Sequence, residues 1–473
     1  MLRPPVALLA LAASLVVGAG CTDPTEIGGE LLEEDDLPIA FTDTVALAFE
    51  TVRLDPSASG AIQSLGNAGA RSAVSFGCLD DPELGTTRAS IGFELIVADL
   101  IDSLDGLLQF RPDSAVLSVP LDPGFQVGDT TAVTHLVVEG LEPGTVDLTE
   151  ALTSDPFEGT GVVYGSFTAV PPRDSVAVEV FSRDGTSETV RRGPTLRIPL
   201  DAEAFDSTAL SPARALLAAA GDDDTSLPDS AFTAAFGGLL LGPDPAAPCA
   251  STLPALALTS ARLDELTVTV YVTQLSGAVA EYDLALRRGT AVGTADLRPA
   301  YTHDYDGTPA GEALELGLAG GRGFVQGLDG LGVELSLPDV GAAASGPVAV
   351  NYAVLDVPVV LDGFTEPVGV IDLQVRNSVG DLVNTSGYTI VGDPDADDLI
   401  IRVGPYGPAE DSVAVYRFNV TEYLQGVASG EREAAVVIVP RDRSFVARRS
   451  ILNLAAGDEL PGARLLLATT ELP

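Results

Sequence analysis

Two histidines are the side chains whose charge can change near neutral pH, so they are the first candidates for chemistry. His303 precedes Asp304, and a histidine with a carboxylate could supply two parts of a Ser-His-Asp site. No Gly-x-Ser-x-Gly turn marks a nucleophile. His135 precedes the apolar run 136–138, which favours a structural role. The sequence therefore predicts that the protein is not an enzyme, and a secreted hydrolase stands third among the functions considered.

An acidic run at 392–398 is the candidate metal site. Asp393, Asp395, Asp397 and Asp398 include carboxylates at alternate positions, as a calcium-binding loop does. The glycine such a loop needs at its sixth position is replaced by Asp398, and no Glu stands at the twelfth. The run is therefore either a weak calcium site or a solvated acidic turn, and no other cofactor is predicted.

The three cysteines divide into an anchor and a pair. Residues 1–20 form a signal peptide, with Arg3, an apolar run of about 12 residues and small residues before Cys21. We expect Cys21 to be acylated, which gives an outer-membrane lipid anchor, although Gly18 stands where a lipoprotein signal prefers Leu and ordinary signal-peptide cleavage is the alternative. Cys78 and Cys249 can form a disulfide in an oxidising compartment, but the sequence does not place them within reach of each other.

The charge excludes one class of partner. The chain has 68 acidic and 25 basic side chains, for a net charge of −43, and every basic residue is Arg. Such a charge repels nucleic acid. It predicts a protein from a salt-adapted source, where salt screens a crowded acidic surface.

The elements that must position these residues are strands. Residues 265–273 alternate apolar and polar side chains, and Gly and Pro turns separate many similar segments, which predicts an all-β fold. Ala115–Pro120 returns as Ala353–Pro358, and 174–178 returns as 411–415, so we predict two tandem β-sandwich units. The predicted parts are the signal peptide at 1–20, the lipidated Cys with an acidic tether at 21–37, and two domains at 38–290 and 291–473. One short helix, beginning at Ser211, is expected as an insertion in the first domain.

Several short segments follow one another in an order that is typical of one family. They are Ile27-Gly28, 41–44, 81–89, 113–117, 196–198, 236–239, His303-Asp304-Tyr305, 326–330 and 416–421. In these segments, which run through nearly the whole chain, it resembles a family of predicted Bacteroidota lipoproteins catalogued as "domain of unknown function forty-two seventy". Gly18, Cys78 and the absence of Lys depart from that pattern. The resemblance implies an outer-membrane lipid anchor and no known activity. At the level of the fold, the paired units also look similar to the jelly-roll sandwiches of carbohydrate-binding modules.

The expected function is that of a non-catalytic structural or protein-binding module of the outer membrane, on either its periplasmic face or the cell surface. An envelope protein is the first expected partner, because paired sandwiches present edges and loops suited to assembly. Glycan binding is the second alternative. It would need exposed aromatic rings, and in a chain without Trp these would be Tyr271, Tyr282, Tyr301 or Tyr305.

Overall fold

The computed structural model describes the chain from residue 39 to residue 471 with gaps. The described ranges are 39–42, 47–57, 73–97, 111–143, 152–182, 186–212, 214–215, 236–286, 297–337, 347–376, 382–384, 400–402, 413–441, 443, 445, 447–456 and 461–471.

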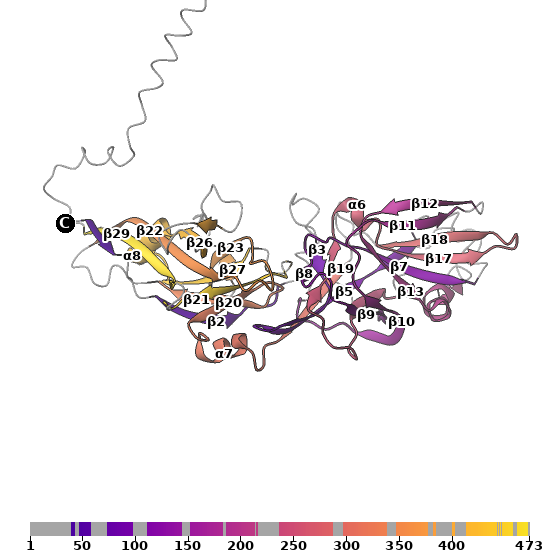
Figure 1. Ribbon diagram of the computed structural model, residues 1–473, viewed down its shortest axis with the longest axis horizontal. Helices are drawn as coiled ribbons and strands as arrows, with labels where there is room; N and C mark the ends of the chain where they lie inside the picture. Colours follow the sequence, from indigo (N-terminus) through magenta and orange to yellow (C-terminus); the bar gives the residue numbers. More distant parts are fainter. Residues whose placement is uncertain are drawn as a thin grey trace, which may run out of the picture.

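The chain is all-β, as predicted, and its antiparallel sheets are curled. Two groups of strands lie end to end (Figure 1). We call β3 to β19 the first unit, and β1, β2 and β20 to β29 together with the helix α7 the second unit.

The first unit is a sandwich of two sheets. One has the order β13-β7-β17-β18-β6, and the other has the order β10-β9-β14-β5-β19 with β4 paired to β5. Apolar side chains from both sheets, such as Leu117 and Leu136, meet in one buried core. Its strands are β3 (Ala73–Ser75), β4 (Gly77–Asp81), β5 (Gly85–Phe93), β6 (Leu95–Val97), β7 (Ser114–Pro120), β8 (Val127–Gly128), β9 (Thr134–Leu141), β10 (Gly159–Ala169), β11 (Val176–Phe181), β12 (Ser187–Arg192), β13 (Thr195–Leu200), β14 (Leu239–Pro243), β15 (Thr252–Leu253), β16 (Ala255–Ala257), β17 (Thr267–Thr273), β18 (Val279–Leu286) and β19 (Leu297–Asp304).

The second unit is built on one large curled sheet. Its main order is β1-β29-β22-β28-β20-β21-β27-β23-β24, with β2 paired to β21 and β26 paired to β22 and β25. A second core, which includes Leu355 and Ile438, fills the curl. Its strands are β1 (Ile39–Thr42), β2 (Ala48–Arg53), β20 (Arg322–Gln326), β21 (Leu331–Ser336), β22 (Val348–Val360), β23 (Ile371–Arg376), β24 (Leu382–Asn384), β25 (Ile400–Arg402), β26 (Val413–Asn419), β27 (Ala435–Pro440), β28 (Arg449–Asn453) and β29 (Arg464–Glu471).

The first sequence echo marks equivalent strands in the two units. Ala115–Pro120 lies in β7, between β13 and β17, and Ala353–Pro358 lies in β22, between β26 and β29. The registers agree as well, because Leu117 and Leu355 occupy the same position of the echo and each is paired with apolar residues on both sides. The second echo does not mark equivalent strands. Residues 174–178 lead into β11, which pairs with β12, whereas 411–415 lead into β26, which pairs with β22.

The inserted helix begins earlier than predicted. Helix α3 (Ala202–Phe205) starts after Asp201, whose carboxylate accepts hydrogen bonds from the backbone N–H groups of residues 203 and 204 at 3.0 Å. It continues into the π-helical segment η2 (Asp206–Leu210), after which residues 211–212 and 214–215 are again α-helical, so the helix predicted from Ser211 is present as the continuation of a helical run that starts at residue 202. Helix α8 (Thr421–Ala428) follows β26 as α3 follows β13. The second unit therefore has a helix at the equivalent point, in addition to the helix predicted in the first.

Two more helices connect strands. They are α6 (Ser260–Leu263) and α7 (Pro309–Leu316). In the part of the chain that the structure describes, no helix is both long and apolar enough to cross a membrane.

The path of the chain places the first unit inside the second. β1 pairs with β29 and β2 pairs with β21, so both N-terminal strands belong to the second unit, although they fall inside the predicted domain 38–290. Conversely, β19 lies beyond residue 290 but pairs with β5 in the first unit. The first unit is thus an insertion between β2 and β20. The predicted tether, which ends at residue 37, leads into the second unit, whereas we expected it to lead into the first.

Candidate functional site

Several sequence-predicted site residues lie outside the described residues. These are the lipidation candidate Cys21 and the weak calcium candidates Asp393, Asp395, Asp397 and Asp398. Within the described ranges, no three His, Cys, Asp or Glu side chains are grouped so that they could hold a metal ion.

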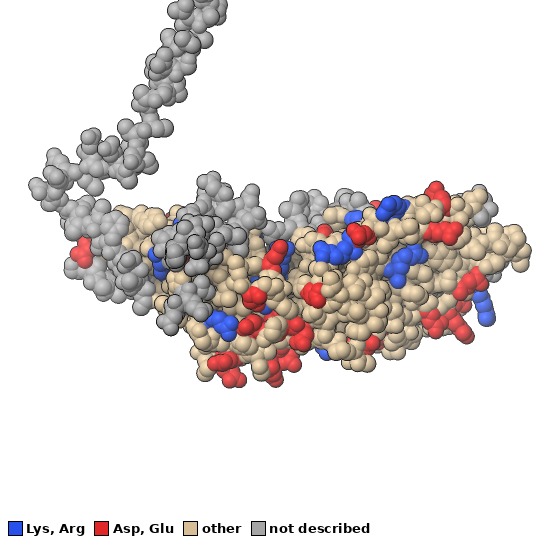
Figure 2. Space-filling model, viewed as in Figure 1, with Lys and Arg blue, Asp and Glu red and all other residues tan. Residues whose placement is uncertain are grey.

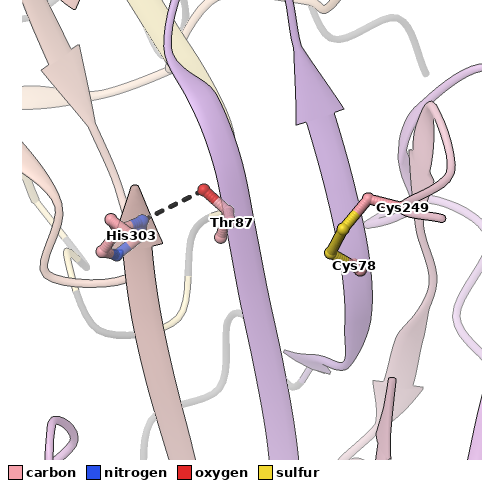
Figure 3. Close-up of a disulfide and its surroundings, with 4 residues drawn as sticks. All are labelled: Cys78, Thr87, Cys249 and His303. Carbon is pink, nitrogen blue, oxygen red and sulfur yellow. Dashed lines mark hydrogen bonds between the residues drawn. A yellow bond between two sulfur atoms is a disulfide. The ribbon is translucent and has the colours of Figure 1, made fainter. Parts of the chain in front are cut away.

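Cys78 and Cys249 are joined by a disulfide within the first unit (Figure 3). Their Cα atoms are 4.8 Å apart, and the bridge spans 171 positions of sequence. Backbone hydrogen bonds support the same contact, because the N–H of Ala250 donates to the carbonyl of Cys78 at 3.1 Å and the N–H of Asp80 donates to the carbonyl of Ala250 at 2.8 Å. The bridge therefore fastens the segment before β15 to β4.

The two histidines are engaged in structural contacts. His135 is on β9, and its Nδ1 lies 3.3 Å from the hydroxyl of Thr168 on β10. His303 is on β19, with Nδ1 3.0 Å from the Thr87 hydroxyl and Nε2 2.9 Å from the Leu328 carbonyl oxygen. The Asp304 carboxylate accepts a hydrogen bond from the N–H of Asp306. The His303-Asp304 pair therefore does not have the geometry of a catalytic dyad.

A buried polar region lies where the two units touch, and we call it the inter-unit contact. It consists of the turn 81–85 from the first unit, the turn 327–330 from the second, and the side chains around them. Three segments on which the family resemblance rests, 81–89, 303–305 and 326–330, meet here.

The turn 327–330 joins β20 to β21 and enters the first unit. Leu328 and Asp329 have φ of 55° and 56°, a conformation that is costly for residues other than Gly. Contacts with the first unit hold the turn in this form. The Leu328 side chain is buried in an apolar cluster with Leu79, Ala89 and Tyr301 of the first unit.

The Asp329 carboxylate is surrounded by donors. It accepts hydrogen bonds from the N–H and hydroxyl of Ser57 at 3.0 and 2.8 Å and from the hydroxyl of Thr153 at 2.7 Å, and the Arg443 Nε lies 3.4 Å away. A carboxylate has about four acceptor positions, so these donors fill them. Asp329 is therefore committed to holding the turn.

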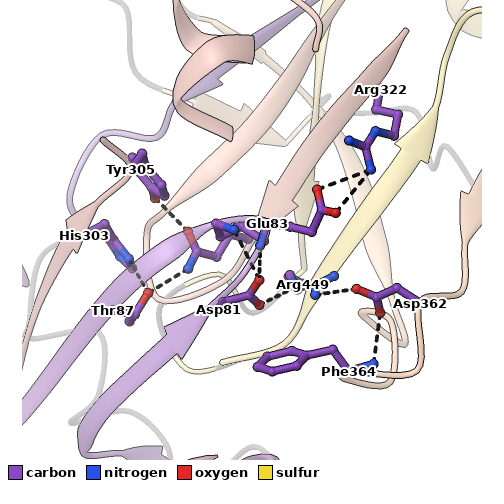
Figure 4. A network of polar contacts seen from close by, with 11 residues as sticks. Asp81, Glu83, Thr87, His303, Tyr305, Arg322, Asp362, Phe364 and Arg449 are labelled. Atoms are coloured by element: carbon purple, nitrogen blue, oxygen red, sulfur yellow. Dashed lines mark hydrogen bonds and ion pairs between the residues drawn. The ribbon is translucent and has the colours of Figure 1, made fainter. Parts of the chain in front are cut away.

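A chain of hydrogen bonds crosses the inter-unit contact beside this turn (Figure 4). The Tyr305 hydroxyl donates to Gln326 Oε1 at 2.7 Å, and Gln326 Nε2 donates to the Thr87 hydroxyl oxygen at 2.9 Å. Thr87 must then donate to Nδ1 of His303, whose Nε2–H donates to the Leu328 carbonyl. The chain thus requires a neutral histidine protonated on Nε2.

The turn 81–85 makes the reciprocal contact. Its Asp81 pairs with Arg449 of β28, and the same guanidinium reaches Asp362 at 2.6 Å. Glu83 pairs with Arg322 of β20 at 3.2 Å (Figure 4). Between these pairs, Leu84 is buried with Phe324, Ile451 and other apolar residues of the second unit. Each unit therefore places one turn into the other.

A cavity of about 280 Å³ lies at the same contact, with Arg53, Tyr301, His303 and Tyr305 among its lining residues. The Arg53 guanidinium is stacked over the Tyr305 ring, 4.9 Å from its centroid. The Tyr301 hydroxyl is buried and has no hydrogen-bond partner among the described residues. Burial, with the nearby Asp329 carboxylate, raises the pKa of Tyr301 well above its ordinary value, so this phenol is neutral at physiological pH.

The tyrosines predicted as stacking platforms are not arranged for stacking. Tyr282, Tyr301 and Tyr305 are buried, and Tyr271 is half-buried with its hydroxyl accepting a hydrogen bond from Arg197. The described tyrosine with a large exposed surface is Tyr352 on β22, which is 48% exposed. The alternation of β22 did not reveal it, because Tyr352 follows an irregularity in the pairing with β29.

Comparison with known proteins gives no match to a family model, to a curated protein or to a solved structure. The resemblance to the predicted lipoprotein family stays a prediction.

Proposed function

We propose that this protein is a lipid-anchored, non-catalytic structural or protein-binding module of the outer membrane. The observation that carries the proposal is that charged and titratable side chains, which could otherwise do chemistry, are bonded to other residues at the inter-unit contact. Four charged or titratable groups there, Arg449, Asp81, Asp329 and His303, are each bonded across or beside it. Such a use of polar groups fixes the orientation of the two units, as a scaffold requires.

The position of the anchor follows from the path of the chain. If Cys21 carries a lipid, the tether 22–37 enters the second unit at β1, next to the C-terminal strand β29 (Figure 1). The second unit would then lie nearer to the membrane and the first farther from it. We expect the partner to be an envelope protein that contacts the first unit.

The test is affinity purification of the tagged, lipidated protein from gently solubilised outer membranes in native salt. A partner recovered in stoichiometric amount, and absent from a control lipoprotein carrying the same anchor and tag, supports the proposal. Loss of that partner in a chain lacking the first unit, with the second unit shown to be folded, would locate the binding surface. Recovery of the protein alone would count against stable assembly.

Glycan binding is the second candidate, and Tyr352 is the observation that favours it. This ring is exposed on the second unit, beside Asn351, whose amide donates to the Thr470 hydroxyl at 2.7 Å. An exposed ring next to a polar side chain is a common sugar contact. Retention on a polysaccharide matrix that falls in Tyr352→Ala, but not in the buried-ring control Tyr282→Phe, would support it. Equal retention by both would exclude Tyr352 as the platform.

A further inference from the structure

His303 lies on the surface where the first unit receives the second. Its Nε2 donates to the carbonyl oxygen of Leu328 in the second unit, and its Nδ1 accepts from Thr87 in the first. Both contacts fit the neutral ring. A second proton on Nδ1 would turn the acceptor that Thr87 needs into a donor.

The Thr87 hydroxyl has few other hydrogen-bond partners within reach. The Thr87 side chain is buried, and its oxygen already accepts from Gln326 Nε2. If protonated His303 also donated to that oxygen, the Thr87 proton would need a new acceptor. The nearest member of the chain, Gln326 Oε1, already accepts from Tyr305. A proton on His303 therefore leaves the buried Thr87 hydroxyl proton without its acceptor, in the middle of the network that links the units, and an unmade buried hydrogen bond is costly.

The charged and titratable groups around His303 come from three elements. Arg53 of β2 lies over the ring of Tyr305, which in turn stacks on His303 with 5.7 Å between centroids. Asp329 of the turn 327–330 is the opposing negative charge, but other donors occupy its acceptor positions. Tyr301 and Tyr305 of the β19 segment are held neutral, because burial raises the pKa of each. Burial likewise lowers the pKa of His303, against smaller opposing effects of the Leu328 carbonyl and Asp329.

We propose that the inter-unit contact is a pH-sensitive latch, closed while His303 is neutral and released when His303 takes up a proton. The sign follows from proton linkage. In the released state His303 would regain an ordinary pKa near 6.5, whereas in the closed state its pKa is lower, so the released state binds more protons. The closed state is fully favoured above about pH 6.5 and loses stability as the pH falls. One proton changes the equilibrium between the closed and released states by up to about 30-fold between pH 7.5 and 5.0.

The experiment measures hydrogen exchange of the whole mature chain at pH 7.5 and 5.0 in native salt, corrected for the intrinsic rate at each pH. The reporters are peptides covering the turn 327–330 of the β20–β21 hairpin and the turn 81–85. Turn amides in this hairpin are bonded to other loops of the second unit, such as the N–H of Asp329 to the carbonyl of Arg443 at 3.0 Å. We expect protection in these peptides to fall at least tenfold at pH 5.0, with little change in the core peptides of each unit.

The chain supplies its own control, because it has two histidines. His303→Gln keeps a donor and an acceptor but cannot be protonated in this range, so its protection should not change between the two pH values. His135→Gln, on β9 with its ring against Thr168 of β10, should behave as the wild type does. Equal loss of protection in His303→Gln and the wild type would overturn the proposal, because protonated carboxylates would then explain the effect. Wild-type protection that does not change with pH would overturn it as well.

If His303→Gln loosens the inter-unit contact at every pH, a second measurement on the wild-type chain still tests the proposal. Isotopically labelled histidine in the wild-type chain gives two titration curves, which His135→Gln assigns. The midpoint for His303 must coincide with the loss of protection. Titration of His303 without loss of protection, or loss of protection while His303 stays neutral, would overturn the latch.

Discussion

Arg449 is the single residue whose removal should test the inter-unit contact most directly. Its guanidinium is 5% exposed and is bonded to two carboxylates, Asp81 of the first unit and Asp362 of the second. Its Cζ also lies 5.3 Å from the centroid of the Phe364 ring. In Arg449→Ala the Asp81 carboxylate would keep the backbone N–H groups of Glu83 and Leu84 but lose its cation.

Removing one partner of a buried ion pair costs about 3–5 kcal/mol, because the other charge stays buried without compensation. The lost contact with Phe364 adds about 0.5–2 kcal/mol, as for other cation–π pairs. Arg441→Ala is the matched control. Arg441 also pairs with an aspartate, Asp372, at 2.9 Å, but its side chain is 53% exposed, so its loss should cost about 1 kcal/mol or less. Arg449→Lys should fall between the two, since lysine keeps the charge but cannot bridge both carboxylates.

The measurement is urea unfolding at fixed salt, followed by far-ultraviolet circular dichroism and tyrosine fluorescence. Urea is preferred to guanidinium, which would itself screen the ion pairs. If the units unfold together, the urea midpoint for Arg449→Ala should fall in proportion to the whole expected loss of unfolding free energy. If the variant uncouples the units, a second transition should appear, and the two probes should no longer coincide. An Arg449→Ala variant that lost no more stability than Arg441→Ala, and unfolded in the same single transition, would show that the buried ion pair does not stabilise the contact.

Three further predictions concern other features of the fold. Replacing both Cys78 and Cys249 by Ser should lower the unfolding free energy by up to about 5 kcal/mol, the chain-entropy value for so long a loop; an alkylation assay that finds two thiols in the denatured, unreduced wild type would contradict the bridge. Asp329→Ala should cost about 2–4 kcal/mol in urea unfolding, because Ser57 and Thr153 lose their acceptor, while Asp329→Asn, which tolerates the same backbone conformation, should cost less. If the acidic surface is adapted to salt, the melting temperature should be higher in molar salt than in low salt. An unchanged or lower melting temperature in molar salt would contradict the adaptation.

The strands were predictable because their signal is local. The alternation in 265–273 corresponds to β17, and the echoed segment 115–120 corresponds to β7. Helix α7 was predictable by the same reasoning but was missed, although Thr308 caps it, Pro309 occupies its first turn and Gly317 ends it. At Ser211 a similar pattern correctly predicted helical backbone, but it missed the earlier start of the helical run at the cap Asp201 and the π-helical segment that precedes Pro212.

The inter-unit contact could not be predicted, because its partners are remote in sequence. Asp81 and Arg449 are 368 positions apart, and each alone looks like part of a solvated turn or strand. Residues 326–330 stood out as a motif, yet nothing local indicates that Leu328 and Asp329 adopt a left-handed conformation. That β1 and β2 belong to the second unit could not be predicted either, because their partners β29 and β21 are also remote in sequence. Consecutive strands usually pair with near neighbours in sequence.

The insertion of one unit within the other has a consequence for biogenesis. The first unit can complete its sheets once residue 304 has been synthesised, because its strands pair among themselves. In contrast, β2 must wait for β21, and β1 must wait for β29, almost the whole length of the chain later. Pairings of such high contact order form slowly, and their unpaired edges are open to wrong partners meanwhile. The strand nearest the proposed anchor is therefore among the last to be secured, and a chain that ends before residue 464 would leave it without its neighbour.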